Sequence, residues 1–122
     1  MRRLAIGLMA LGLLAACGGG SSSGPSQPAG SIKVTMTEYK FDPSTISAPN
    51  GKVVFFIVNS GTISHDFIIR DGSGARVGGS ELISAGDSSS FTVDSIKAGT
   101  YTYYCDQPGH EASGMKGTLT IT

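Results

Sequence analysis

Short runs of alternating apolar and polar residues recur along most of the chain. Ile32, Val34 and Met36 alternate with polar residues, which is the period-two pattern of a strand with one buried face. The same alternation returns further along, at Phe91 and Val93, at Tyr101 and Tyr103, and at Leu119 and Ile121. Each of these runs is therefore predicted to be a short strand whose apolar side chains point into a core.

Other segments complete an all-β pattern. Residues 53–58 form a continuous run of β-branched and aromatic side chains, typical of a central strand with little solvent exposure. Residues 67–69 are predicted to be a further strand, and the glycine-rich stretch 71–80 a loop. Turn signals stand at Asp42-Pro43 and at 49–51, and no stretch after residue 30 has a helical period. The fold class is thus predicted to be all-β, a β-sandwich of about seven to eight strands.

The first residues have a different character. Two arginines follow the initial Met, residues 4–14 are apolar apart from two glycines, and the sequence Leu14-Ala15-Ala16-Cys17 comes next. A basic start, a short apolar stretch and small residues at a cleavage point are typical of a secretory signal. The apolar run covers roughly 16 Å, too short for a permanent helix across a bilayer core about 30 Å thick.

The Leu-Ala-Ala-Cys sequence resembles the lipobox of bacterial lipoproteins, in which the cysteine carries lipid and becomes the first residue of the mature chain. The resemblance implies that residues 1–16 are a lipoprotein signal peptide and that Cys17 is the site of lipid attachment. We then expect an exported protein, anchored to the membrane and facing the periplasm or the cell exterior. The alternative is an ordinary signal peptide with cleavage nearby and a free Cys17.

Residues 18–30 read GGGSSSGPSQPAG and contain no charged, aromatic or large aliphatic side chain. Such a segment buries too little surface to offset its conformational entropy. We therefore expect residues 17–30 to be a lipid-anchored flexible linker and residues 31–122 to be one folded domain.

Charge and cysteine content narrow the functional classes. The chain has nine Lys+Arg and nine Asp+Glu, and loss of Arg2 and Arg3 with the signal leaves seven against nine, a net charge of about −2. This balance does not favour nucleic-acid binding. With Cys17 assigned to lipid, Cys105 has no disulfide partner. A lone thiol in an oxidising compartment is a liability unless something occupies it, and a metal is the obvious candidate.

The chemically informative stretch has the spacing Cys-x4-His-x4-Met at Cys105, His110 and Met115. A thiolate, an imidazole and a thioether are soft or borderline ligands. Two histidines, a cysteine and a long axial methionine form the ligand set of blue copper electron-transfer sites. The only other histidine is His65, forty residues before Cys105. Strands that are distant in sequence lie side by side in a sandwich, so we expect His65 to face this loop.

Two segments resemble the cupredoxin family, the blue copper proteins that include auracyanin, plastocyanin and azurin. The sequence NSGTISHDFI at 59–68 is similar to the segment with the family's first histidine ligand, and GTYTYYCDQPGHEASGM at 99–115 to the segment with the other three. The resemblance covers residues 31–122. It implies a Greek-key β-sandwich (cupredoxin-like) that binds one type 1 copper.

By this resemblance Cys105 binds copper as a thiolate, His65 and His110 complete the plane, and Met115 is the weak axial ligand. The backbone amide of Asp66 is a candidate donor to the Cys105 sulfur. Relatives commonly carry asparagine at this position, and a carboxylate near copper, if ionised, favours Cu(II). Zinc is the rival metal, but it has little use for a methionine ligand.

The function expected is a blue copper electron carrier that shuttles single electrons between membrane or periplasmic redox partners, as a monomer. The alternative is a copper carrier or sensor without redox turnover, and a third reading is a structural or adhesive sandwich. The axial Met115 and single thiolate favour the electron carrier. We do not expect an enzyme, because four protein ligands leave no open position for a substrate.

Overall fold

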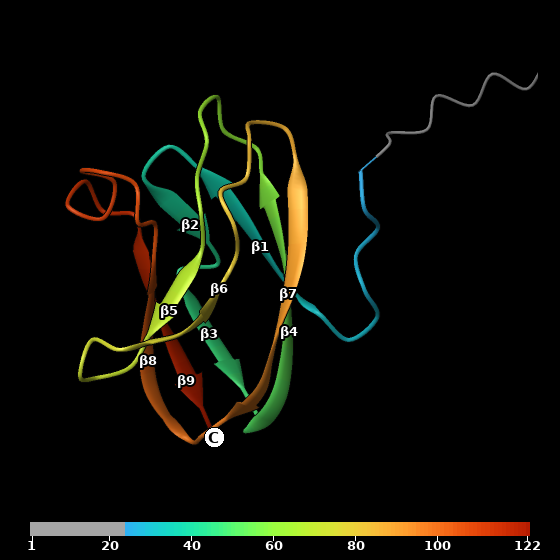
Figure 1. Ribbon diagram of the computed structural model, residues 1–122, viewed down its shortest axis with the longest axis vertical. Helices are drawn as coiled ribbons and strands as arrows, with labels where there is room; N and C mark the ends of the chain where they lie inside the picture. The colour runs from blue at the N-terminus through green and yellow to red at the C-terminus, as the bar shows by residue number, and fades with distance from the viewer. Residues whose placement is uncertain (1–23) are drawn as a thin grey trace, which may run out of the picture.

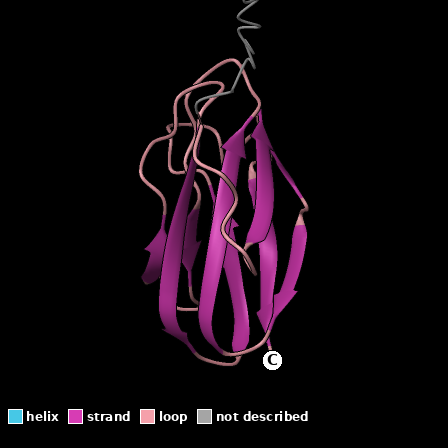
Figure 2. Ribbon diagram, turned by 90° about the vertical axis from the view of Figure 1, so that its right-hand side faces the viewer, coloured by secondary structure: helices cyan, strands magenta, loops and turns pink. Residues whose placement is uncertain are grey.

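The computed structural model describes residues 24–122, which fold into two β-sheets packed face to face (Figures 1 and 2). The predicted signal peptide 1–16 and the predicted lipid site Cys17 lie outside the described residues. No helix among residues 24–122 is long and apolar enough to cross a membrane. The strands are β1 Ile32–Thr37, β2 Lys40–Asp42, β3 Thr45–Ala48, β4 Gly51–Asn59, β5 Ile68–Arg70, β6 Arg76–Gly79, β7 Ser88–Ile96, β8 Gly99–Tyr104 and β9 Lys116–Ile121.

The two sheets have the orders β2-β1-β4-β7 and β3-β9-β8-β5-β6. The pairs β1/β4 and β3/β9 are parallel, and the other neighbouring strands are antiparallel. Strands distant in sequence are therefore neighbours in space, as in a Greek key. The all-β sandwich predicted from the alternation is confirmed, with nine strands in the described part of the chain.

The core lies between the sheets and contains the apolar residues that alternate along the strands. Val34 and Met36 of β1 are fully buried, and so are Phe55 and Ile57 of β4. Tyr103 of β8 contributes an aromatic ring from the opposite sheet and is also fully buried. At about 25 cal/mol per Å² of apolar surface, each such side chain contributes about 1.5–3 kcal/mol.

One predicted loop contains a strand. The glycine-rich stretch 71–80 includes β6, which pairs with β5. A Cβ on Gly78 would lie 2.8 Å from Val93 Cγ2, and one on Gly79 would lie 2.8 Å from the carbonyl oxygen of Phe67. These glycines therefore allow close packing of a strand, and the glycine-rich pattern does not indicate a flexible loop there. The short strands β2 and β3 were not predicted either.

Candidate metal centre

Strand pairing brings the predicted ligands to one end of the sandwich. In the sheet, Tyr104 of β8 is opposite Ile68 of β5 on one side and Lys116 of β9 on the other. Both neighbours run antiparallel to β8, so the residues that precede them lie beside the residues that follow β8. Cys105 therefore lies between the segment that leads into β5, which carries His65, and the end of its own loop.

Three ligand atoms lie close together at this end. Nδ1 of His65 is 3.1 Å from Nδ1 of His110, and the Cys105 sulfur is 3.9 Å from the first and 3.4 Å from the second. His65 and Cys105 are buried, with exposures of 0% and 1%, while His110 is partly exposed. Within residues 24–122, no other group of three or more His, Cys, Asp or Glu side chains is placed to hold a metal ion.

The spacing of these atoms fits a single metal ion. Ligand atoms about 2.0–2.3 Å from one ion in a trigonal plane are separated by about 3.5–3.8 Å. The observed separations are 3.1, 3.4 and 3.9 Å. One sulfur and two imidazole nitrogens are the donor set that suits copper.

Met115 is fully buried, and its backbone joins it to the other two residues of the loop. Its N–H donates to the carbonyl of His110 at 3.1 Å, and its carbonyl accepts from the N–H of Cys105 at 3.2 Å. These two hydrogen bonds hold the Cys-x4-His-x4-Met loop as one compact unit. The thioether is thereby carried on the same short loop as the thiol and the partly exposed imidazole.

The environment of the Cys105 thiol contains opposing influences. Burial is the largest and raises the pKa of the thiol, while the backbone amides of Asp66 and Gln107 hydrogen-bond to it and lower the pKa. Thiolate formation in this buried position therefore requires a compensating cation. A bound metal supplies that charge, so metal binding at this site is coupled to release of the thiol proton.

Asp66 joins the two segments that carry the buried ligands. Its Oδ1 accepts the N–H of Asp106 at 2.6 Å, and its Oδ2 is 3.4 Å from Nε2 of Gln107. A carboxylate oxygen accepts a hydrogen bond as an amide oxygen does, so the contact with the Asp106 N–H does not depend on the charge of Asp66. Its backbone amide donates to the Cys105 sulfur, the contact expected from the resemblance to the family.

Glu38 is a contact residue that the sequence analysis missed. It lies in the turn between β1 and β2, and its Oε1 is 3.4 Å from Nε2 of His65. The same oxygen accepts backbone N–H groups from Thr62 at 2.7 Å and Ile63 at 3.2 Å. The hydrogen bond from Thr62 is the largest cause that lowers the pKa of Glu38 to about 2, with smaller contributions from Ile63 and His65. No motif marks a single glutamate in a turn, so the sequence carries no signal for it.

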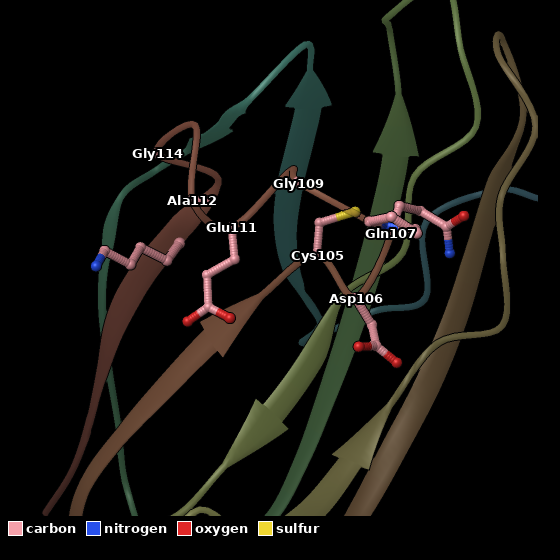
Figure 3. A pocket seen from close by; sticks show the side chains of 9 residues that line it. Cys105, Asp106, Gln107, Gly109, Glu111, Ala112 and Gly114 are labelled. Atoms are coloured by element: carbon pink, nitrogen blue, oxygen red, sulfur yellow. The ribbon is translucent and has the colours of Figure 1, made fainter.

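The surface of the ligand loop is hollowed, and several of the residues that line the hollow are small. A hollow of about 520 Å³ beside the loop is lined by Cys105, Asp106, Gln107, Pro108, Gly109, Glu111, Ala112, Gly114 and Lys116. Figure 3 shows the Cys105 sulfur just beyond the end of β8, with the Asp106 and Glu111 carboxylates directed away from it. The ring of Tyr39 meets the His110 ring edge-on, with centroids 5.1 Å apart.

An ion pair holds the ligand loop against β5. The guanidinium of Arg70 makes two hydrogen bonds to the carboxylate of Glu111, which follows His110. The same guanidinium lies 4.3 Å from the centroid of the Tyr104 ring. The hydrogen bond from Arg70 is the main cause that lowers the pKa of Glu111.

A small two-sheet β-sandwich with one mononuclear, sulfur-containing metal site at one end is the architecture of a blue copper protein. Residues 7–121 match the family model described as a cupredoxin-like domain. The chain therefore belongs to the cupredoxin family. The cofactor of this family is one type 1 copper ion, and His65, Cys105, His110 and Met115 are positioned as its site.

Several curated relatives are similar to the chain. It is 27% identical to the copper-resistant cuproprotein CopI of Rubrivivax gelatinosus, over 74% of this chain and 65% of that protein. It is 51% identical to auracyanin-B of Chloroflexus aurantiacus, over 34% and 17%, respectively. The chain thus spans less than two thirds of the length of these two relatives. Plastocyanin of Daucus carota is 34% identical, over 67% of this chain and 87% of that protein.

Solved structures agree with the fold. Auracyanin B superposes with a TM-score of 0.70 and 25% identity, over 80% of this chain and 92% of the other. The dithionite-reduced auracyanin of Roseiflexus castenholzii also gives a TM-score of 0.70, at 21% identity, over 79% and 99%. At that identity the second likeness shows the fold alone.

Proposed function

We propose that the protein is a blue copper electron carrier that passes single electrons between redox partners at a membrane or in the periplasm. The carrying observation is the cluster of one thiol and two imidazoles, with atoms 3.1–3.9 Å apart, in which two ligands are buried and one is partly exposed. Copper bound there supplies the one-electron chemistry by cycling between Cu(I) and Cu(II). The residues of the chain hold the ligands in place and provide a partly exposed edge for contact with a partner.

The protein keeps the ligand positions constant. Two backbone hydrogen bonds join His65 to Ile83. The N–H of His65 donates to the carbonyl of Ile83 at 3.1 Å, and the N–H of Ile83 donates to the carbonyl of His65 at 2.8 Å. Cys105 and Met115 are joined by the hydrogen bond from the N–H of Cys105 to the carbonyl of Met115, at 3.2 Å. Ligands held by a rigid sheet rearrange little when the charge at the site changes, which keeps the barrier to electron transfer low.

His110 provides the route to a partner. It is the one member of the imidazole–thiol cluster with solvent exposure, and its neighbours Pro108, Gly109 and Ala112 are exposed and uncharged. Small neighbouring side chains let the surface of another protein approach the imidazole edge closely. The proposal therefore assigns electron entry and exit to the His110 edge, with the protein acting as a monomer and without catalysis.

The proposal includes the lipid anchor. Processing after residue 16 and lipid attachment at Cys17 would hold the domain at the membrane, facing the periplasm or the cell exterior, on the linker 17–30. Mass spectrometry of the N-terminal peptide and membrane fractionation test this part. Cys17→Ser is expected to release the protein from the membrane fraction without changing its visible spectrum, and a soluble wild-type protein would refute it.

The direct test of electron transfer is the visible spectrum of the full chain, purified in detergent and loaded with Cu(II). We expect an intense visible band that bleaches with a mild reductant, returns with an oxidant through repeated cycles, and is absent from Cys105→Ser. A folded protein that binds copper without this band would refute the electron-carrier proposal.

A copper-handling role is the second candidate, because a relative at 27% identity is named a copper-resistant cuproprotein. The two roles differ in what happens to the ion on reduction. A carrier of electrons keeps Cu(I) in the presence of a Cu(I) chelator for many redox cycles, whereas a carrier of copper gives it up within one. Chelator absorbance after each cycle distinguishes the two.

A further inference from the structure

The carboxylate of Glu38 lies against the buried side of the copper ligand His65. Its Oε1 is 3.4 Å from His65 Nε2, while Nδ1 of the same imidazole faces His110 and Cys105. The two imidazole nitrogens thus have separate surroundings, the metal cluster on one side and an acidic oxygen on the other. The His65 side chain is 0% exposed and that of Glu38 is 35% exposed, so the contact is shielded on one side only.

The loop before His65 is shaped to receive this carboxylate. Backbone N–H groups of Thr62 and Ile63 donate to the same Oε1 atom. A Cβ on Gly61 would lie 2.4 Å from Oε1, so a side chain at this position would displace the carboxylate. Gly61 has no left-handed backbone conformation to account for it. The absence of a side chain at Gly61 therefore leaves room for the Glu38 carboxylate.

The chemistry of a metal-bound histidine gives this contact a consequence. A neutral imidazole that binds a metal through Nδ1 carries its hydrogen on Nε2, and a carboxylate that accepts this hydrogen fixes the tautomer and the ring orientation. The same partner makes the imidazole a more basic ligand. A fixed negative charge near the ion also stabilises Cu(II) relative to Cu(I).

We propose that Glu38 is a positioning residue of the copper site, which holds His65 in the Nδ1-binding tautomer and lowers the reduction potential of the bound copper. The proposal rests on copper binding through His65 and goes beyond electron transfer as such. It applies equally to an electron carrier and to a copper-handling protein.

Two substitutions separate the charge of Glu38 from its hydrogen bond. Glu38→Gln keeps an oxygen that accepts from the backbone and from His65 but removes the charge, whereas Glu38→Ala removes both. Asp94→Asn is the matched control, because it also removes one negative charge. Asp94 is exposed and lies on β7 beside the start of β4, whereas the loop that leads to His65 follows Asn59 at the other end of β4. All variants are made in the full chain, and urea unfolding of each metal-free protein monitors the fold.

The first readouts are Cu(II) and Cu(I) affinity by chelator competition and the reduction potential. Loss of such a partner typically weakens metal binding 10–100-fold. We expect Cu(II) affinity to fall about tenfold further than Cu(I) affinity in Glu38→Ala, which raises the potential by about 59 mV. Glu38→Gln is expected to shift the potential in the same direction by a smaller amount.

The second readout needs no copper. Nitrogen-15 chemical shifts of the His65 imidazole in the metal-free protein report which nitrogen carries the hydrogen. We expect hydrogen on Nε2 in the wild type and in Glu38→Gln, and a mixture of tautomers in Glu38→Ala. Gly61→Ala, which displaces the carboxylate without removing it, should reproduce the Glu38→Ala result.

The proposal is overturned if the affinities, the potential and the His65 tautomer in both Glu38 variants match those of Asp94→Asn. A loss of folding stability alone would assign Glu38 a purely structural role in the loop and would equally refute it. A wild-type protein that lacks the blue band but shows the Glu38 effects on affinity and tautomer would refute only the electron-carrier function, so the two failures are distinguishable.

Discussion

Asn59 offers the sharpest test of how this structure supports its metal site. Its side chain is fully buried at the end of β4. Its Nδ2 donates to the carbonyls of Ile63 at 2.9 Å and Ile83 at 2.8 Å, and its Oδ1 accepts from the N–H of Gly61 at 3.0 Å. One amide thus joins the loop before His65 to the segment that pairs with His65.

The cost of removing this amide follows from the number of hydrogen bonds. Each is worth about 0.5–1.5 kcal/mol net, so Asn59→Ala is expected to lower the free energy of unfolding by about 3 kcal/mol. For a domain of this size, that loss corresponds to a fall of about 12–24 °C in the melting temperature. Asn59→Asp should cost more at neutral pH, because it replaces a donor between two carbonyls with another acceptor.

Urea unfolding of the metal-free protein measures the change, and copper affinity by competition measures its effect on the site. Asn50→Ala is the matched control, because exposed Asn50 makes a single side-chain hydrogen bond, to the carbonyl of Thr122 at 2.8 Å. That control is expected to cost at most about 1 kcal/mol. Copper affinity should fall with Asn59→Ala, since His65 is then less well positioned, and should not fall with the control.

Two results would refute this reasoning. One is an Asn59→Ala protein as stable as Asn50→Ala, which would mean that water or backbone relaxation replaces all three hydrogen bonds. The other is Asn59→Asp with a stability equal to that of Asn59→Ala, which would mean that the donor identity of Nδ2 has no importance.

Two further predictions concern the fold near the site. Burial raises the pKa of Tyr103 from 10.0 to about 12, so the stability linked to its protonated form is present below pH 10 and is lost as the pH rises toward 12. Tyr103→Phe is expected to remove this alkaline loss, which unfolding curves at high pH measure. The same variant is expected to cost about 1 kcal/mol at pH 7, because the hydrogen bond to the Pro43 carbonyl is lost. Arg70 lowers the pKa of Glu111, so the ion pair stabilises the protein at neutral pH, and this contribution is lost progressively as the pH falls below 4.5. Arg70→Gln is expected to destabilise the protein by up to about 1 kcal/mol at pH 7 and by less at pH 3, where urea unfolding at both values measures the difference; an equal loss at both would contradict the assignment.

The sequence alone determined the class of fold and most of the chemistry. Alternation at Val34 and Met36 identifies a buried face because a strand turns successive side chains to opposite sides. The Cys-x4-His-x4-Met spacing is equally local, since Cys105, His110 and Met115 lie on one short loop closed by its own hydrogen bonds. Patterns of this kind can be predicted from the sequence because neighbours in sequence remain neighbours in space.

The short strands β2, β3 and β6 could not be predicted from the sequence. β2 and β3 contain three and four residues, too few for alternation to exceed chance. In β6, Gly78 and Gly79 resemble loop residues, and only their contacts with Val93 and the Phe67 carbonyl show why the chain has no side chains there. Packing against another strand decided these elements.

The sequence predicted that His65 faces the loop with the other ligands, but only the tertiary structure decided the distances and the contact on its other side. Its distance of 3.1 Å from His110 follows from the antiparallel pairing of β5 with β8, and that register is a property of the whole sheet. The contact with Glu38 depends on a turn 27 residues earlier in the chain and on the space left by Gly61. Neither Glu38 nor Gly61 belongs to a local sequence pattern. The role of the Glu38 carboxylate depends on which residues the fold places within hydrogen-bonding distance of it.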